Sequence, residues 1–138
     1  MNTVESARVL ELPRIERVKG SITPVEGGAT IPFQIARVYY IYDVVGGSER
    51  GGHAHLDLDQ VLVAVMGSFT VSLDDGESRR SVELNRPYSG LYIPRLIWRE
   101  LRDFSSGAVC LVLASIPYGE DDYVREYDRF LALRGHAG

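Results

Sequence analysis

The sequence contains a single cysteine, Cys110, so no disulfide can form within the chain. Its longest apolar stretches, residues 61–66 and 108–116, are far shorter than the roughly 20 residues that cross a bilayer. The N-terminus mixes acidic and basic residues and lacks the apolar segment of a secretory signal peptide. We therefore expect a soluble protein of the reducing cytoplasm that has no membrane partner.

Positive charge is also scarce. The 15 lysine and arginine residues are outnumbered by 19 acidic residues, which leaves a net charge of −4. The basic residues form no run, whereas proteins that bind nucleic acids carry a basic patch or stripe. We therefore expect no nucleic-acid partner.

Apolar residues, by contrast, make up 45% of the 138 residues, which is enough to bury the core of one domain spanning residues 1–138. They occur in short segments rich in β-branched and aromatic residues, separated by glycine, proline and Asp-Gly turns. Such a series predicts a β-sandwich or β-barrel. The expected strands occupy residues 35–45, 60–66, 69–73, 81–84, 91–93, 97–101 and 108–116.

The two ends of the chain differ from this central pattern. Residues 1–30 are mixed, with short strands expected at residues 9–11 and 16–20. Residues 120–134 place apolar side chains near i, i+3/i+4 and i+7, which predicts one amphipathic helix packed on the β-domain. Asp121 and Asp122 fall in its first turn, so we interpret them as residues that begin the helix and not as an acid–base pair.

The densest group of chemically active residues is a pair of histidines framed by glycines. Gly47 is followed after five residues by His53 and His55, after four more by Gln60, and after six more by Gly67. Side chains alternate along a strand, so the two histidines point the same way, roughly 6–7 Å apart along it. The spacing resembles the first motif of the cupins, small jelly-roll barrels in which an acidic residue stands at the position of Gln60.

No metal ion is expected at these histidines. A cupin metal site usually combines two histidines with a carboxylate and a third histidine from a later strand. Gln60 is a neutral amide and a poor substitute for the carboxylate. Where the third histidine would fall, the chain has Trp98 and Arg99, and a guanidinium repels a divalent cation.

Without a metal, the histidines are candidates for general acid–base catalysis. An unperturbed imidazole has a pKa of about 6.5 and can both accept and donate protons near neutrality. Tyr39 or Tyr42 could orient an imidazole or donate to an oxyanion, and Arg50 or Arg99 could bind phosphate or stabilise an enolate. The alternative is that both histidines make only structural hydrogen bonds inside a barrel. The glycine frame and the arginines favour catalysis.

Other residues have structural interpretations as well. Cys110 is expected to be inert core, because a reactive thiol needs an exposed electropositive setting. Gln60 could form a hydrogen bond with a buried backbone group. Trp98 could pack in the core or stack on a nucleotide base. Arg99 either lines the cavity of the histidines or pairs with a neighbouring acidic residue at the surface.

Longer stretches of the sequence resemble the dTDP-sugar 3,4-ketoisomerase family. The match covers roughly residues 31–131, and its motifs run in the family's order. The matching stretches are residues 37–43 (Arg-Val-Tyr-Tyr-Ile-Tyr-Asp), 50–55 (Arg-Gly-Gly-His-Ala-His), 60–63, 90–100 (Gly-Leu-Tyr-Ile-Pro-Arg-Leu-Ile-Trp-Arg-Glu), 103–105, 112–115 and 122–130.

This resemblance implies a small cupin-type jelly roll that forms a homodimer, with N-terminal strands from residues 1–30 exchanged between subunits. It implies an isomerase that moves the ketone of dTDP-4-keto-6-deoxy-D-glucose from C4 to C3 through an enediol, without a metal or cofactor. The product would pass to an aminotransferase that makes 3-amino-3,6-dideoxy sugars.

By motif position, His53, His55 and Tyr39 match active-site residues of the family, and we expect His53 to be the principal acid–base residue. The residues expected to bind the substrate are Arg37, Arg50, Gln60, Trp98 and Arg99.

Two other functions remain open: a dTDP-sugar 3,5-epimerase, which would also use histidine and tyrosine, and a non-catalytic cupin that binds sugars. The stereochemistry at C4 is a further question, because some members of the family carry histidine at the position of Arg99. An arginine cannot shuttle protons at neutral pH. We therefore favour the gluco-configured 3-keto sugar here, with histidine-bearing relatives more able to yield the galacto epimer.

Overall fold

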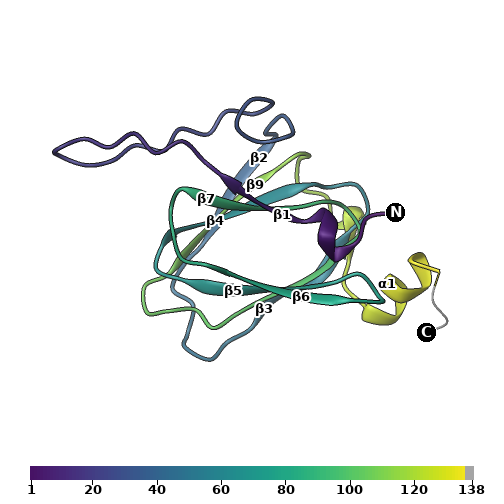
Figure 1. Cartoon of the computed structure of the whole chain (residues 1–138). Helices are drawn as coiled ribbons and strands as arrows, with labels where there is room; N and C mark the ends of the chain where they lie inside the picture. Colours follow the sequence, from purple (N-terminus) through teal and green to yellow (C-terminus); the bar gives the residue numbers. More distant parts are fainter. Residues whose placement is uncertain (136–138) are drawn as a thin grey trace.

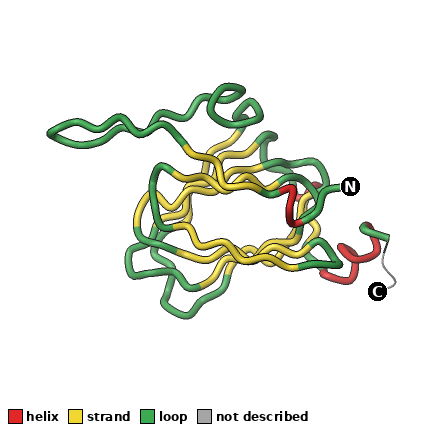
Figure 2. Tube along the Cα trace, viewed as in Figure 1, coloured by secondary structure: helices red, strands yellow, loops and turns green. Residues whose placement is uncertain are grey.

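The computed structural model describes residues 1–135, whose strands form two five-stranded antiparallel sheets (Figures 1 and 2). The strands are β1 (Arg8–Glu11), β2 (Arg37–Ile41), β3 (Arg50–His55), β4 (Gln60–Met66), β5 (Phe69–Asp74), β6 (Arg79–Leu84), β7 (Ser89–Ile93), β8 (Trp98–Arg102), β9 (Val109–Ala114) and β10 (Tyr123–Val124). The helical elements are the 3-10 turns η1 (Val4–Ser6) and η2 (Glu120–Asp122) and the helix α1 (Tyr127–Leu133). The first sheet has the order β1-β7-β4-β9-β2 and the second β10-β3-β8-β5-β6, so the expected mainly β fold is confirmed.

Apolar side chains fill the space between the two sheets. β5 shows the pattern that this requires, because Phe69, Val71 and Leu73 are buried while Thr70 and Ser72 are partly exposed. This period of two is typical of a strand with one face on the core.

The first sheet is covered on its outer face as well. Val61 and Val63 of β4 point away from the space between the sheets and pack in one cluster with Leu12 and Ile31 of the N-terminal region. The first five residues of β4 are thus buried on both faces, which explains why its sequence is a nearly continuous apolar run.

The segment between β1 and β2 begins with an arm that projects from the barrel (Figure 1). An isolated bridge joins Ile15 to Ile22 in this arm. The strand expected at residues 16–20 is wrong, because the Gly20 N–H donates to the Arg17 carbonyl oxygen at 3.2 Å and Gly20 has a φ of 136°. A turn therefore interrupts the expected strand, whereas the strand expected at residues 9–11 is confirmed as β1.

β2 forms one edge of the first sheet. It is shorter than the strand expected at residues 35–45, and Asp43 beyond its end adopts a left-handed φ of 55°. Its side chains alternate, and those of Val38 and Tyr40 are exposed. The strand therefore presents one face to the interior and an apolar face to the surface.

A C-terminal helix is confirmed, but α1 is shorter than the helix expected at residues 120–134. η2 and β10 occupy the first part of that range, and β10 pairs with β3. The apolar residues that suggested a longer helix still pack together, although the first of them lies in a strand. Val124 of β10 and Phe130 of α1 belong to the same buried cluster. No helix in the described part of the chain is long and apolar enough to cross a membrane.

Candidate active site

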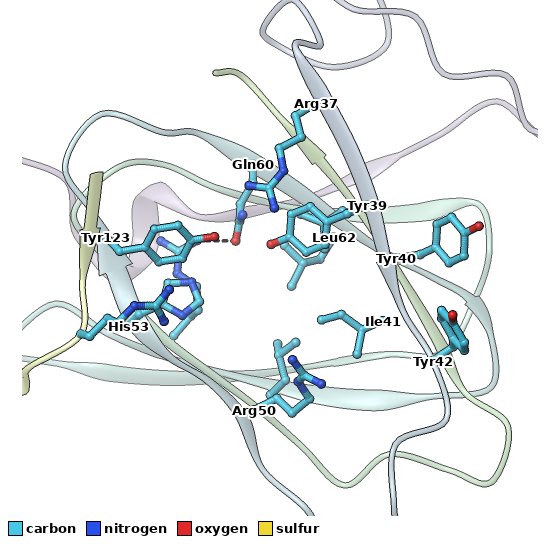
Figure 3. A pocket seen from close by; sticks show the side chains of 14 residues that line it. Arg37, Tyr39, Tyr40, Ile41, Tyr42, Arg50, His53, Gln60, Leu62 and Tyr123 are labelled. Carbon is cyan, nitrogen blue, oxygen red and sulfur yellow. Dashed lines mark hydrogen bonds between the residues drawn. The ribbon is translucent and has the colours of Figure 1, made fainter. Parts of the chain in front are cut away.

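A cavity of about 480 Å³ lies between the two sheets (Figure 3). β2, β4 and β9 contribute to one wall, and β3, β8 and β10 to the other. Among the described residues, none of the lining side chains is acidic, which suits a negatively charged ligand. The lining residues are Arg37, Tyr39, Tyr40, Ile41, Tyr42, Arg50, His53, Gln60, Leu62, Arg99, Leu101, Val112, Tyr123 and Arg125.

Arg99 is buried in the wall that β8 forms, with 1% of its surface exposed. Its guanidinium donates to the Ile97 carbonyl oxygen at 2.8 Å and to Oε1 of Gln60 at 2.5 Å. Burial lowers the pKa of Arg99 to about 10, so the group stays charged at neutral pH. Arg99 thus lines the cavity as expected, and the alternative of a surface ion pair is wrong.

His53 lies directly across from Arg99 in the antiparallel pairing of β3 with β8. Its imidazole lines the cavity, and its Nε2 has no hydrogen-bond partner within the described protein. Burial lowers the pKa of His53 to about 2, and the positive charge of Arg99 acts in the same direction. The ring is therefore neutral near pH 7 and has a lone pair that can accept a proton.

His55 lies beside His53 but is fully buried and does not line the cavity. The two rings meet edge-on, with their centroids 4.8 Å apart. Burial lowers the pKa of His55 to about 2, with Arg99 and Arg125 acting in the same direction. Its Nδ1 lies 2.9 Å from Oδ2 of Asp122, and the ring has no other hydrogen-bond partner among the described residues.

Tyr39 points from β2 into the cavity, whereas Tyr40 and Tyr42 stand at its rim on the exposed side of the strand (Figure 3). Of the two candidates that the sequence offered, Tyr39 therefore faces the cavity, whereas Tyr42 is separated from the histidines. Burial raises the pKa of Tyr39, with Tyr123 adding to the effect and Arg99 opposing it. The phenol therefore keeps its proton at neutral pH and can donate a hydrogen bond.

Arg37 and Arg50, which are expected to bind the substrate, both line the cavity. The guanidinium of Arg37 lies 4.4 Å from the ring centroid of Tyr39 and 4.9 Å from that of Tyr118. Its Nη1 is buried and has no protein partner within the described residues. Arg37 is therefore held in place by aromatic rings while one donor stays free to bind an anion.

Trp98 does not line this cavity, and the expectation that it binds substrate there is wrong. It precedes Arg99 on β8, and consecutive residues of a strand face opposite sides. Trp98 packs instead on the far face of the second sheet, where its ring centroid lies 5.7 Å from that of Phe130.

Three residues of the site were assigned to the expected C-terminal helix: Asp122, Tyr123 and Arg125. Tyr123 pairs with His55 across β10 and β3, lines the cavity, and has its ring centroid 5.1 Å from that of His53. The guanidinium of Arg125 lies 4.2 Å from the Tyr123 ring centroid. The interpretation of Asp122 as a residue that begins a helix is wrong, because η2 and β10 replace the first turns. The family resemblance held the only signal for all three, in its stretch at residues 122–130.

The donor set of the cavity does not suit a metal ion. Within residues 1–135, no three or more histidine, cysteine, aspartate or glutamate side chains are grouped so that they could hold one. At two positions where cupins have ligands, Gln60 and Arg99 bind each other. Cys110 is buried in β9, and burial raises the pKa of its thiol to about 12, which agrees with an inert core residue.

Comparisons with known proteins identify the family of this chain. A family model described as "WxcM-like, C-terminal" (FdtA) matches residues 5–135. The TDP-4-oxo-6-deoxy-alpha-D-glucose-3,4-oxoisomerase of Aneurinibacillus thermoaerophilus is 46% identical over 123 residues, which cover 89% of this chain and 88% of that protein.

Solved structures of similar proteins have the same fold. A mutant of the 3,4-ketoisomerase QdtA from Thermoanaerobacterium thermosaccharolyticum, in complex with TDP-4-keto-6-deoxyglucose, is 41% identical, with a TM-score of 0.93 and 96% of each chain covered. The WlaRB TDP-quinovose 3,4-ketoisomerase from Campylobacter jejuni is 43% identical, with a TM-score of 0.89, over 94% of this chain and 99% of that chain. The expected cupin-type barrel is thereby confirmed. The chain belongs to the WxcM-like, C-terminal family, that of the TDP-sugar 3,4-ketoisomerases.

Proposed function

We propose that this protein converts dTDP-4-keto-6-deoxy-D-glucose into its 3-keto isomer. The observation that carries this proposal is the placement of a neutral imidazole, His53, across from a buried cation, Arg99, in one cavity. The names of the similar proteins support the substrate class. The alternatives of a 3,5-epimerase and of a non-catalytic sugar-binding module are not favoured, because these relatives are 3,4-ketoisomerases.

The reaction needs a base, a group that stabilises negative charge, and a proton donor. His53 takes the C3 proton, which the neighbouring C4 ketone acidifies, and negative charge develops on O4. The guanidinium of Arg99 and the phenol of Tyr39 stabilise this charge. Loss of the O3 proton, protonation of O4 and return of a proton to C4 leave the ketone at C3. No electron leaves the substrate, so the chemistry requires no redox cofactor.

The rest of the cavity suits a nucleoside diphosphate. Arg37, Arg50 and Arg125 supply positive charge for the two phosphates, and tyrosines offer flat surfaces for the nucleotide. The 3-keto product is a carbonyl substrate for an aminotransferase, which would install a 3-amino group. We assign both steps to the cytoplasm, since a free buried cysteine agrees with a reducing compartment.

We also propose that the protein is a homodimer in which the N-terminal arm contacts the partner. Two apolar side chains of the arm support this, because Val18 is fully exposed and Ile22 is 55% exposed in the single chain. The exposed face of the edge strand β2, with Val38 and Tyr40, offers a second apolar surface. Apolar surface of this kind is typical of an interface between copies of a chain.

At C4, we favour the gluco configuration of the product. Arg99 stands where histidine-bearing relatives have a potential proton donor, and its guanidinium stays charged at neutral pH. In a 6-deoxyglucose the hydrogens on C3 and C4 lie on opposite faces of the ring, so the proton that reaches C4 would come from the face opposite His53. An imidazole at position 99, which pairs with His53 across β3 and β8, would instead supply it from the face of His53. The name of the Campylobacter jejuni protein supports this choice, because quinovose is 6-deoxyglucose.

The reaction can be tested directly by incubating the purified protein with dTDP-4-keto-6-deoxyglucose and following the products by NMR. We expect a 3-keto product at a rate that a chelator does not change. His53→Asn should lower turnover on the order of 10²–10⁴-fold, because the amide has no basic nitrogen. Circular dichroism and the oligomeric mass serve as controls for folding. Activity that is lost on chelation and restored by zinc, iron or manganese would contradict the proposal, as would near-normal turnover of folded His53→Asn.

The homodimer can be tested by light scattering at micromolar concentration, where we expect twice the mass of the chain. The double variant Val18→Asp and Ile22→Asp should shift the mass toward the monomer, because two charges would be buried at the interface. Val45→Asp, at an exposed residue of another loop, is the matched control. A monomer for the unmodified protein, or a double variant that stays fully dimeric, would count against the arm as an interface.

The C4 outcome can be tested by NMR of fresh product from the wild type and Arg99→His. We expect a gluco product from the wild type and some galacto epimer from the variant, since an imidazole at this position can deliver a proton. Arg50→His, which adds an imidazole at another position of the cavity, is the control and should give only the gluco product. A galacto product from the wild type would refute the assignment, and identical products and rates from Arg99→His would remove Arg99 from the C4 step.

A further inference from the structure

The carboxylate of Asp122 is fixed by two hydrogen bonds at the end of β3. Its Oδ2 lies 2.9 Å from Nδ1 of His55, and its Oδ1 accepts the backbone N–H of Asp57 at 2.7 Å. The backbone carbonyl oxygen of Asp122 also accepts the N–H of Leu56 at 2.9 Å. The side chain is 10% exposed, so little solvent competes for these contacts.

These contacts determine which nitrogen of His55 carries the proton. In a neutral imidazole one ring nitrogen donates and the other accepts. A carboxylate only accepts, so Nδ1 of His55 must be the donor toward Asp122. Nε2 then carries the lone pair, and it is buried without a hydrogen-bond partner among the described residues.

The ring of His55 in turn supports two rings of the cavity. It meets His53 edge-on at 4.8 Å, with an interplanar angle of 88°, and its centroid lies 4.5 Å from that of Tyr123. Both of these neighbours line the cavity, whereas His55 itself does not. A change in the orientation of His55 would therefore move His53, the proposed base, and Tyr123.

We propose that Asp122 is a positioning residue that fixes His55 as the Nδ1–H tautomer and thereby holds His53 in the orientation that proton transfer requires. This inference rests on the proposed ketoisomerase function for its kinetic consequence, but the tautomer itself does not depend on that function. The competing explanation is that Asp122 only fastens the C-terminal segment to β3.

The variant Asp122→Asn separates these explanations. Its side chain has one acceptor oxygen, whereas two donors, the Asp57 N–H and the His55 Nδ1–H, face it. The backbone N–H of Asp57 can only donate, whereas the imidazole of His55 can carry its proton on Nε2 in place of Nδ1. We therefore expect the amide oxygen to stay on Asp57, the amide N–H to donate to Nδ1, and the tautomer of His55 to be reversed.

The test combines nitrogen-15 NMR of the imidazoles with steady-state kinetics. The chain has three histidines, so the spectrum is simple, and the variants His53→Asn and His55→Asn identify the signals of these two. We expect His55 to be the Nδ1–H form in the wild type and the Nε2–H form in Asp122→Asn, with kcat lowered on the order of ten- to a hundred-fold. KM should change little, because Asp122 does not line the cavity. Asp121→Asn, which removes the same charge from an exposed neighbour, should retain the wild-type tautomer and kcat.

An Nε2–H tautomer in the wild type, or a normal kcat in Asp122→Asn, would overturn the proposal. If Asp122→Asn fails to fold, the wild-type spectrum still decides, because only the Nδ1–H form agrees with the inference. If the wild type lacks ketoisomerase activity while the tautomer reverses as expected, the proposed function fails and the role of Asp122 in fixing the tautomer stands.

Discussion

The hydrogen bond between Arg99 and Gln60 is the contact on which the rest of the site depends. It joins β8 of the second sheet to β4 of the first, across the interior of the barrel. A buried cation is tolerated only where its donors are satisfied, and Gln60 and the Ile97 carbonyl oxygen meet that need. The charge so retained helps to keep His53 neutral, since Arg99 acts with burial to lower the pKa of that imidazole. Arg99, at a position where cupins have a metal ligand, thus acts on the protonation state of His53.

The two histidines have different surroundings although they share one face of β3. His53 meets the cavity, whereas His55 is enclosed and bound to Asp122, which lies 67 residues further along the chain. The C-terminal segment therefore contributes to the site through β10, which pairs with β3. α1 secures that segment from outside, because Phe130 and Val124 pack in one buried cluster with Trp98. The C-terminal segment thereby supports the side chains of the cavity from outside the barrel.

The central strands and the His53–Arg99 pair could be predicted because they follow from alternation and spacing along the chain. Tyr123 and Asp122 could not, since residues 120–134 satisfy helical spacing and only pairing with β3 selects a strand there. The assignment of Trp98 failed for a local reason: if Arg99 faces the cavity, its strand neighbour must face away. The turn at Gly20 was missed because its positive φ is a property of the folded backbone, and glycine permits such a conformation without requiring it.

Burial beside Arg99 keeps the imidazole of His53 neutral near pH 7, so that its lone pair is available to accept a proton. The most direct measurement is an NMR titration of the histidine ring resonances between pH 8 and pH 5, with the His53 signal identified by its absence in His53→Asn. An unperturbed imidazole would take up a proton in this range with a pKa of about 6.5. Because the pKa of His53 is lowered to about 2, its signal should stay at the neutral position throughout. A His53 titration with a midpoint near pH 6.5 would contradict the account.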